Sequence, residues 1–246
     1  MTIMKILLLV SCMIVITFIS GTNVYAQDYL TLHSIPKLLN CLQTPSPKID
    51  WSNCMMAQNE YHFSNLSGAN LSGTIMQYPL FYAVNLSGAN MKNSVLAGGN
   101  FAYSDLSGVN LQGADLRNIE FYHANLSDAD LRGANVLGAR FEGVDFSNAK
   151  LSGLDMSNVN MIGANLTNAD LQNAILKNGD LRDVTFEDTN LRGANLQQVY
   201  TNGGSLHDAD LTGANLKGAD ISATDMSCHG NPSCRDTDHN SDDDIP

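Results

Sequence analysis

An apolar residue recurs at every fifth position from Tyr61 to Met226, in one register whose only polar member is Thr201. A small side chain usually stands two positions earlier, as Ala114 precedes Leu116. A period of five fits neither the helical repeat nor the two-residue alternation of a strand, so the chain must turn at short, regular intervals. Such a repeat predicts one stacked unit copied along the chain rather than a globule with a unique core.

The other positions of the repeat indicate which side chains face water. We expect the apolar residue and the small residue before it to point inward, and the remaining three residues to point outward. Gly, Asn or Asp often stands two positions after the apolar residue, as Gly68 follows Leu66, and these residue types tolerate tight turns. The second inward residue is rarely larger than Val, which predicts a narrow interior.

Many copies of the repeat share the pattern A-(N/D)-L-x-x, among them Ala114-Asp115-Leu116, Ala129-Asp130-Leu131, Ala164-Asn165-Leu166 and Ala209-Asp210-Leu211. This pattern resembles that of the pentapeptide repeat family from about Phe63 to Met226. The resemblance implies an all-β fold, a right-handed quadrilateral parallel β-helix with four pentapeptides in each of about eight stacked coils. The sequence departs from the pattern at 75–84, where Pro79 takes a small-residue position, and at 199–205, and we expect local distortion at both.

The sequence itself supports a four-sided coil. With four pentapeptides per coil, residues twenty apart would stack at the inter-strand spacing of about 4.8 Å. One such column contains phenylalanine at four successive coils, which predicts a continuous stack of rings inside one side of the rod. The full column is Tyr61, Phe81, Phe101, Phe121, Phe141, Met161, Leu181, Thr201 and Ile221.

Composition divides the chain into four segments. Residues 1–26 have the features of a signal peptide, because Lys5 precedes an apolar run that is short for a membrane span and Val24-Tyr25-Ala26 suits cleavage. We expect residues 27–60 to form an N-terminal cap with a short helix near 34–42, 61–227 to form the β-helix, and 228–246 to form a cysteine-containing acidic tail. Cleavage after Ala26 would leave a mature protein with no membrane span. The alternatives to cleavage are an uncleaved anchor and a lipoprotein modified at Cys12.

Four cysteines remain after the signal segment, two before the repeats and two after them. An even number, clustered at both ends of an exported chain, predicts the local disulfides Cys41–Cys54 and Cys228–Cys234. Such bonds would close the ends of the solenoid, where unpaired edges otherwise invite association. Free thiols in a reducing compartment are the alternative, and a shared metal site is disfavoured because the pairs lie at opposite ends.

The net charge is −12 at pH 7, which disfavours binding to nucleic acid or anionic lipid. The tail carries oxygen ligands at alternate residues, namely Asp236, Asp238, Asn240 and Asp242. This spacing resembles the opening of a calcium loop but lacks its central Gly and its later Glu. We therefore expect the tail to be a solvated acidic segment and the protein to have no cofactor. Calcium binding by the tail is the alternative.

The sequence contains no arrangement of residues typical of an active site. The six histidines are scattered, there is no phosphate-binding glycine loop or nucleophile motif, and the acidic residues are periodic and outward-facing. We therefore predict that the protein is not an enzyme. A polysaccharide-active β-helix enzyme is the alternative, although such enzymes have longer, irregular coils with loop excursions for which this register leaves no room.

One group of outward side chains exceeds the requirements of the repeat. Four-fold mapping places Tyr82, Tyr103, Tyr122 and His123 outside the phenylalanine column on adjacent coils, whereas most other outward residues are small, amide-bearing or charged. Exposed clustered aromatic rings suit the binding of a carbohydrate or a protein. Chance together with the strand preference of aromatic residues is the alternative explanation.

These observations predict an exported protein, periplasmic or secreted, that binds a protein or glycan or has a structural role in the cell envelope. The rod would be a monomer or an end-to-end homodimer. The family resemblance offers a second function, because members that protect gyrase are acidic rods that mimic DNA. That function requires access to the cytoplasm, which the signal segment disfavours.

Overall fold

The computed structural model describes residues 41–56, 60–76 and 78–234. The chain divides into two units, Met1–Lys37 and Leu38–Pro246, and all of the described residues belong to the second. The expected signal peptide, most of the expected short helix and the acidic end of the tail therefore lie outside the described residues.

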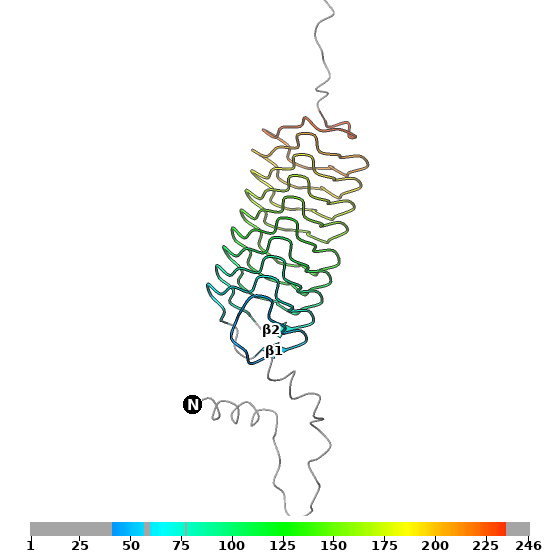
Figure 1. Cartoon of the computed structure of the whole chain (residues 1–246). Coiled ribbons are helices and arrows are strands. Elements are labelled where there is room, and N and C mark those ends of the chain that lie inside the picture. The colour runs from blue at the N-terminus through cyan, green and yellow to red at the C-terminus, as the bar shows by residue number, and fades with distance from the viewer. Residues whose placement is uncertain (1–40, 57–59, 77, 235–246) are drawn as a thin grey trace, which may run out of the picture. The chain divides into compact units, whose positions relative to one another are not determined.

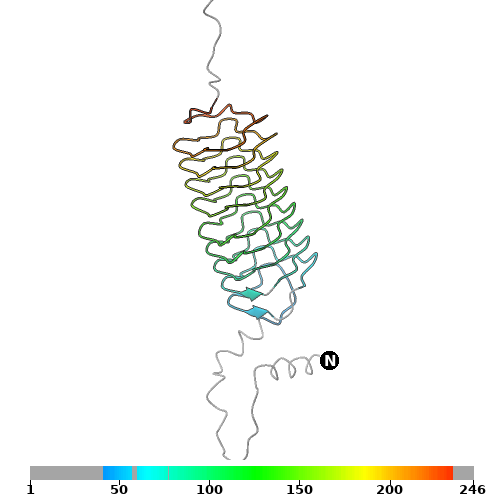
Figure 2. The ribbon, with the colours of Figure 1, turned by 180° about the vertical axis from the view of Figure 1, so that it is seen from behind.

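The second unit is a right-handed, four-sided parallel β-helix, which confirms the fold expected from the repeat (Figure 1). Two short strands, β1 (Met55–Met56) and β2 (Ile75–Met76), pair in parallel on the first coils, and both are visible from behind in Figure 2. Elsewhere one residue of each pentapeptide bridges to the residue twenty positions later, as Asn65 bridges to Asn85. Each coil therefore consists of four pentapeptides.

The coil geometry begins before the expected boundary at residue 61. The first bridge joins Asp50 to Asn70, and the side chain of Trp51 is fully buried in line with the inward column. The last bridge joins Asp210 to His229. Part of the segment expected to be a cap is thus itself the first turn of the solenoid.

Each pentapeptide turns the corner through a β-turn. In the unit beginning at Leu66, the amide of Ala69 donates to the carbonyl of Leu66 over 3.0 Å, and Gly68 has a φ of 64°. A positive φ at the third residue is the type II arrangement, which favours Gly and Asn. It recurs at every fifth described residue from Lys48 to Ala223, which explains the Gly, Asn and Asp column of the sequence.

Backbone hydrogen bonds join successive coils on all four sides. The amide of Leu66 donates to the carbonyl of Asn85 over 2.7 Å, and the amide of Asn70 donates to the carbonyl of Ile49 on the coil below over 2.8 Å. Where Asn or Asp stands before the apolar centre it commonly adds a local bond, as the carboxamide of Asn65 accepts from the amide of Ser67 over 3.1 Å. This bond explains why Asn or Asp stands there.

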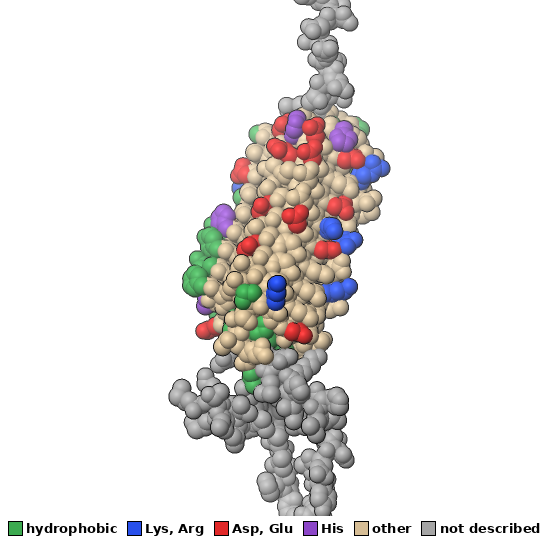
Figure 3. Space-filling view, in the orientation of Figure 1, with side chains coloured by type: hydrophobic (Ala, Val, Ile, Leu, Met, Phe, Trp, Pro, Cys, Tyr) green, Lys and Arg blue, Asp and Glu red, His purple; other side chains and the backbone are tan. Residues whose placement is uncertain are grey.

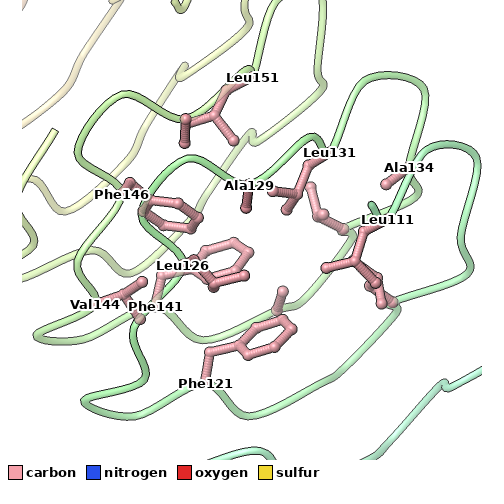
Figure 4. Close-up of a cluster of buried hydrophobic side chains, with 14 of the residues drawn as sticks. Leu111, Phe121, Leu126, Ala129, Leu131, Ala134, Phe141, Val144, Phe146 and Leu151 are labelled. Atoms are coloured by element: carbon pink, nitrogen blue, oxygen red, sulfur yellow. The ribbon is translucent and has the colours of Figure 1, made fainter. Parts of the chain in front are cut away.

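The interior is filled by the apolar centres and the small residues before them (Figure 4). The expected column of rings is continuous, with centroid separations of 4.7 Å for Phe81–Phe101, 5.4 Å for Phe101–Phe121 and 5.6 Å for Phe121–Phe141. All four phenylalanine side chains are at most 1% exposed. The polar centre Thr201 is also buried, and its hydroxyl lies 2.9 Å from that of Thr224.

The ladder continues through both segments that depart from the repeat pattern. In the first, Ile75 and Leu80 keep their bridges to the next coil. In the second, the amide of Gly203 donates to the carbonyl of Ala223, twenty positions later, whereas the amide of Gly68 donates to the residue nineteen positions later. The distortion expected at 199–205 is thus limited to a shifted hydrogen bond.

Both cysteine pairs lie at disulfide distance, with Cα–Cα separations of 5.6 Å for Cys41–Cys54 and 5.1 Å for Cys228–Cys234. The second pair holds a short segment against the last coil, where the side chain of Asn231 donates to the carbonyl of Ala214 over 3.1 Å. Each pair therefore fixes chain that adjoins one end of the solenoid.

The phenylalanine column should be the part of the core most sensitive to truncation. Phe121→Ala should lower the free energy of unfolding by about 3–5 kcal/mol, because it opens a cavity between two rings that cannot close. Leu137→Ala is the matched control, since Leu137 is 63% exposed, and should change it by less than about 0.5 kcal/mol. Denaturant melts measure both, and equal effects would contradict the four-sided register.

Candidate binding surface

Six rings form a row on the outer surface of the side that contains the phenylalanine column. We call this row the aromatic strip; it consists of His62, Phe63, Tyr82, Tyr103, Tyr122 and His123. Figure 3 shows apolar side chains, in green, gathered along the left edge of the rod. Phe63 is 76% exposed and Tyr103 is 50% exposed, so the strip is accessible.

The rings of the strip touch one another from coil to coil. The centroid of Tyr103 lies 5.5 Å from that of Tyr82 and 5.6 Å from that of Tyr122, with interplanar angles of 66° and 82°. Phe63 meets Tyr82 at 5.9 Å and 81°. Edge-to-face contacts of this kind are favourable for aromatic pairs. The strip is therefore one continuous surface in which most neighbouring rings are steeply inclined to each other, and Tyr103 and His123 are near-parallel at 29°.

The structure brings together the four aromatic residues that the sequence singled out. His123 extends the contacts, with its ring 5.7 Å from Tyr103 and 4.2 Å from Tyr122. Sequence reasoning missed His62 and Phe63, which occupy the same outward positions one coil earlier. The signal was present, because both follow Tyr61 as the other strip residues follow their phenylalanines.

The strip departs from the turn chemistry of the rest of the solenoid. Most of the residues with positive φ are Gly, Asn or Asp, whereas the corner column of the strip holds Phe63, Ala83, Tyr103 and His123 in four successive coils. A left-handed conformation is unfavourable for a bulky side chain, and such strain concentrates at functional sites. The fold alone does not call for aromatic residues at these corners.

Polar side chains line one margin of the strip. Arg140 donates to Glu142 Oε1 over 2.9 Å and lies 3.6 Å from Glu120 Oε1, and Asn160 donates to the same Glu142 oxygen over 2.9 Å. The other oxygen of Glu142 is buried and has no hydrogen-bond partner among the described residues. Glu142 lies directly above the strip, because the amide of His123 donates to its carbonyl.

The arginines of the described residues are all engaged by carboxylates, in the pairs Arg117–Asp115, Arg132–Asp130, Arg140–Glu120, Arg140–Glu142, Arg182–Asp180 and Arg192–Asp210. The hydrogen bond from Arg132 lowers the pKa of Asp130 to about 2, and that from Arg117 lowers the pKa of Asp115. A general acid at neutral pH needs a raised carboxyl pKa. These carboxylates therefore lack the character of catalytic acids.

The surroundings of Tyr103 favour the neutral form of its phenol. Desolvation, then the neighbouring Tyr122 and Tyr82, raise the pKa of Tyr103 above its ordinary value. The Tyr103 hydroxyl can therefore act as a hydrogen-bond donor beside its exposed ring face.

The remaining candidate residues do not form a described site. The proposed calcium ligands Asp236, Asp238, Asn240 and Asp242 lie outside the described residues. Within the described part of the chain, no group of three or more His, Cys, Asp or Glu side chains is placed to hold a metal ion.

The family model of pentapeptide repeats matches residues 80–118, 124–163, 155–188 and 189–227, with eight copies of the repeat. The chain belongs to the pentapeptide repeat family. Family members of this architecture are generally structural or binding modules. A comparison with curated proteins finds no match for this sequence.

Solved structures of pentapeptide repeat proteins share this fold. Two trypsin-treated variants of QnrB1, a plasmid-mediated fluoroquinolone resistance protein, are 23% identical to this chain. They give TM-scores of 0.55 and 0.54, covering 70% and 69% of this chain and 81% and 80% of theirs. HetL, involved in regulating heterocyst differentiation in the cyanobacterium Nostoc, is 23% identical over 80% of this chain and 95% of its own, with a TM-score of 0.41.

Tyr103→Asn should relieve strain rather than weaken the fold. Asn adopts the left-handed conformation routinely, whereas other side chains lose about 1–2 kcal/mol there. We expect the free energy of unfolding to stay within about 1 kcal/mol of the unsubstituted value, because lost ring contacts offset the relief. The matched reversal, Asn118→Tyr at another corner, should lower it by about 1–2 kcal/mol. Thermal melts measure both changes. A larger loss of stability for Tyr103→Asn than for Asn118→Tyr would show that the strip stabilises the fold.

Proposed function

We propose that this protein is an exported, non-enzymatic rod of the cell envelope that binds a protein or glycan partner through the aromatic strip. The observation that carries the proposal is the continuity of the strip, six contacting rings across neighbouring coils, three of which, Phe63, Tyr103 and His123, stand at corners where most of the rod has Gly, Asn or Asp. Accessible aromatic rings are enriched where proteins bind partners. The repeat supplies the flat, rigid side on which they stand.

Two features support export. Residues 1–26 have the composition of a cleavable signal peptide. Cys41 and Cys54, and likewise Cys228 and Cys234, lie at disulfide distance, and disulfides persist in oxidising compartments. In the described part of the chain no helix has the length and apolar character to cross a membrane.

The mature protein should begin at Gln27. N-terminal sequencing of protein recovered from the envelope or the medium of producing cells tests this, and intact protein from the cytoplasm is the comparison. An unprocessed Met1 on cytoplasmic protein would contradict export and favour the DNA-mimic function instead.

Loss of two strip rings should abolish binding without loss of the fold. The mature protein carrying Tyr103→Ala and Tyr122→Ala should fail to retain the envelope partner in a pull-down, because central aromatic anchors commonly cost about 2 kcal/mol or more on truncation. Its circular-dichroism melt should stay close to that of the unsubstituted protein.

The matched control carries Ile175→Ala and Tyr200→Ala, which remove exposed apolar side chains elsewhere on the rod. It should retain the partner. Retention by the strip variant, or loss by both variants, would move the functional surface away from the strip.

A further inference from the structure

We propose that the partner docks on the aromatic strip through a basic segment, with arginine or lysine side chains against the tyrosine rings. This inference rests on the proposed function and specifies the chemistry of the partner. The rings of Tyr82, Tyr103 and Tyr122 are each 38–50% exposed, so a cationic side chain can reach them. A cation is attracted to the face of an aromatic ring within about 6 Å of its centroid.

The charges around the strip favour a cationic partner. On this side of the rod, over residues 60–64, 80–84, 100–104, 120–124 and 140–144, the charged residues are Glu60, Glu120, Arg140 and Glu142. The one cation, Arg140, is already engaged by both Glu120 and Glu142. The next side around the corner, over residues 65–69, 85–89, 105–109, 125–129 and 145–149, adds Asp105, Asp128 and Asp145 and no basic residue. Lys48 lies on that side one coil earlier, next to Ser67. The carboxylates are therefore in excess where the rings are exposed.

The acidic groups lie within reach of a cation on the rings. Glu120 and Tyr122 are the outward residues on either side of buried Phe121, and the equivalent pair one coil later, Arg140 and Glu142, is hydrogen-bonded over 2.9 Å. Side chains at these two positions can thus meet across the inward residue between them. A guanidinium over Tyr122 would lie beside the Glu120 carboxylate, which is 46% exposed.

The ring geometry disfavours a sugar chain lying flat on the strip. Stacking of successive sugar rings requires neighbouring aromatic faces that are nearly coplanar. The rings of Tyr82 and Tyr122 are inclined to Tyr103 by 66° and 82°. Tyr103–His123, at 29°, is the one near-parallel pair of the strip. The strip therefore offers a single near-coplanar pair rather than a run of coplanar faces. An isolated cationic group needs only one face at a time. Between the two partner classes, the observations therefore favour a basic protein segment.

The test uses the mature protein and three probes: a short peptide alternating arginine and glycine, the same peptide with neutral citrulline in place of arginine, and a neutral oligosaccharide of N-acetylglucosamine. Isothermal titration calorimetry should show binding of the arginine peptide alone, weakening as salt is added because the carboxylates are screened. Equal binding of the citrulline peptide, or binding of the oligosaccharide in its place, would overturn the proposal.

Matched variants separate the strip from general attraction to an acidic protein. Tyr122→Leu keeps an apolar side chain but removes the ring, and should weaken binding of the arginine peptide about threefold. Tyr200→Leu, at an exposed tyrosine bridged by Asp180 and Asp220, should leave the affinity unchanged. Equal affinity losses for these two variants would show non-specific attraction and contradict the inference.

Two charge variants test the contribution of the carboxylates. Glu120→Gln should weaken binding of the arginine peptide. Glu187→Gln, which removes the charge of an exposed carboxyl away from the strip, should leave binding unchanged. If the strip variants lose the envelope partner but none of these changes alters peptide binding, the proposed function holds and the basic partner is wrong. If neither the partner nor the peptide depends on the strip, both are wrong.

Discussion

The backbone hydrogen bonds between coils determine almost everything else in this structure. Each pentapeptide donates to and accepts from the coils on either side, as Leu66 donates to Asn85 and Asn70 donates to Ile49. Once these bonds are made, every side chain lies next to the one twenty positions away. The molecule therefore behaves as a set of vertical columns, and the suitability of a residue depends on its column neighbours more than on its sequence neighbours.

Stacking within a column is favourable for some pairs of side chains and unfavourable for others. Identical rings pack well on one another, and the inner column of phenylalanines uses this. Identical charges repel at the spacing of adjacent strands, about 4.8 Å. In the described residues no bridge pairs two carboxylates: Asn125 separates Asp105 from Asp145 and donates to Asp105 over 3.3 Å. In the bridge columns of this acidic chain, amide, basic or apolar side chains thus stand between carboxylates of successive coils.

The aromatic strip is not explained by column stacking or by the turn chemistry of the repeat. Phe63 and Tyr103 occupy corners where the backbone favours Gly or Asn, and their rings lie in solvent rather than in the core. Neither backbone geometry nor burial accounts for them. Exposure, local strain and a margin of carboxylates coincide on one side of the rod, and this coincidence separates the strip from scattered surface tyrosines such as Tyr200.

The five-residue period predicted a stacked solenoid and its inward and outward positions, because a strict short repeat admits few ways to stack. The resemblance to the pentapeptide repeat family implied the four-sided coil, and the phenylalanine column supported it. The four-sided mapping also placed Tyr82, Tyr103, Tyr122 and His123 on one surface. Only the tertiary structure showed that the coil geometry begins before residue 61, with a first bridge at Asp50, that His62 and Phe63 extend the strip, and that Arg140 is held between two glutamates. Those features depend on side-chain directions and distances between coils, which a repeat pattern predicts by column but not by contact.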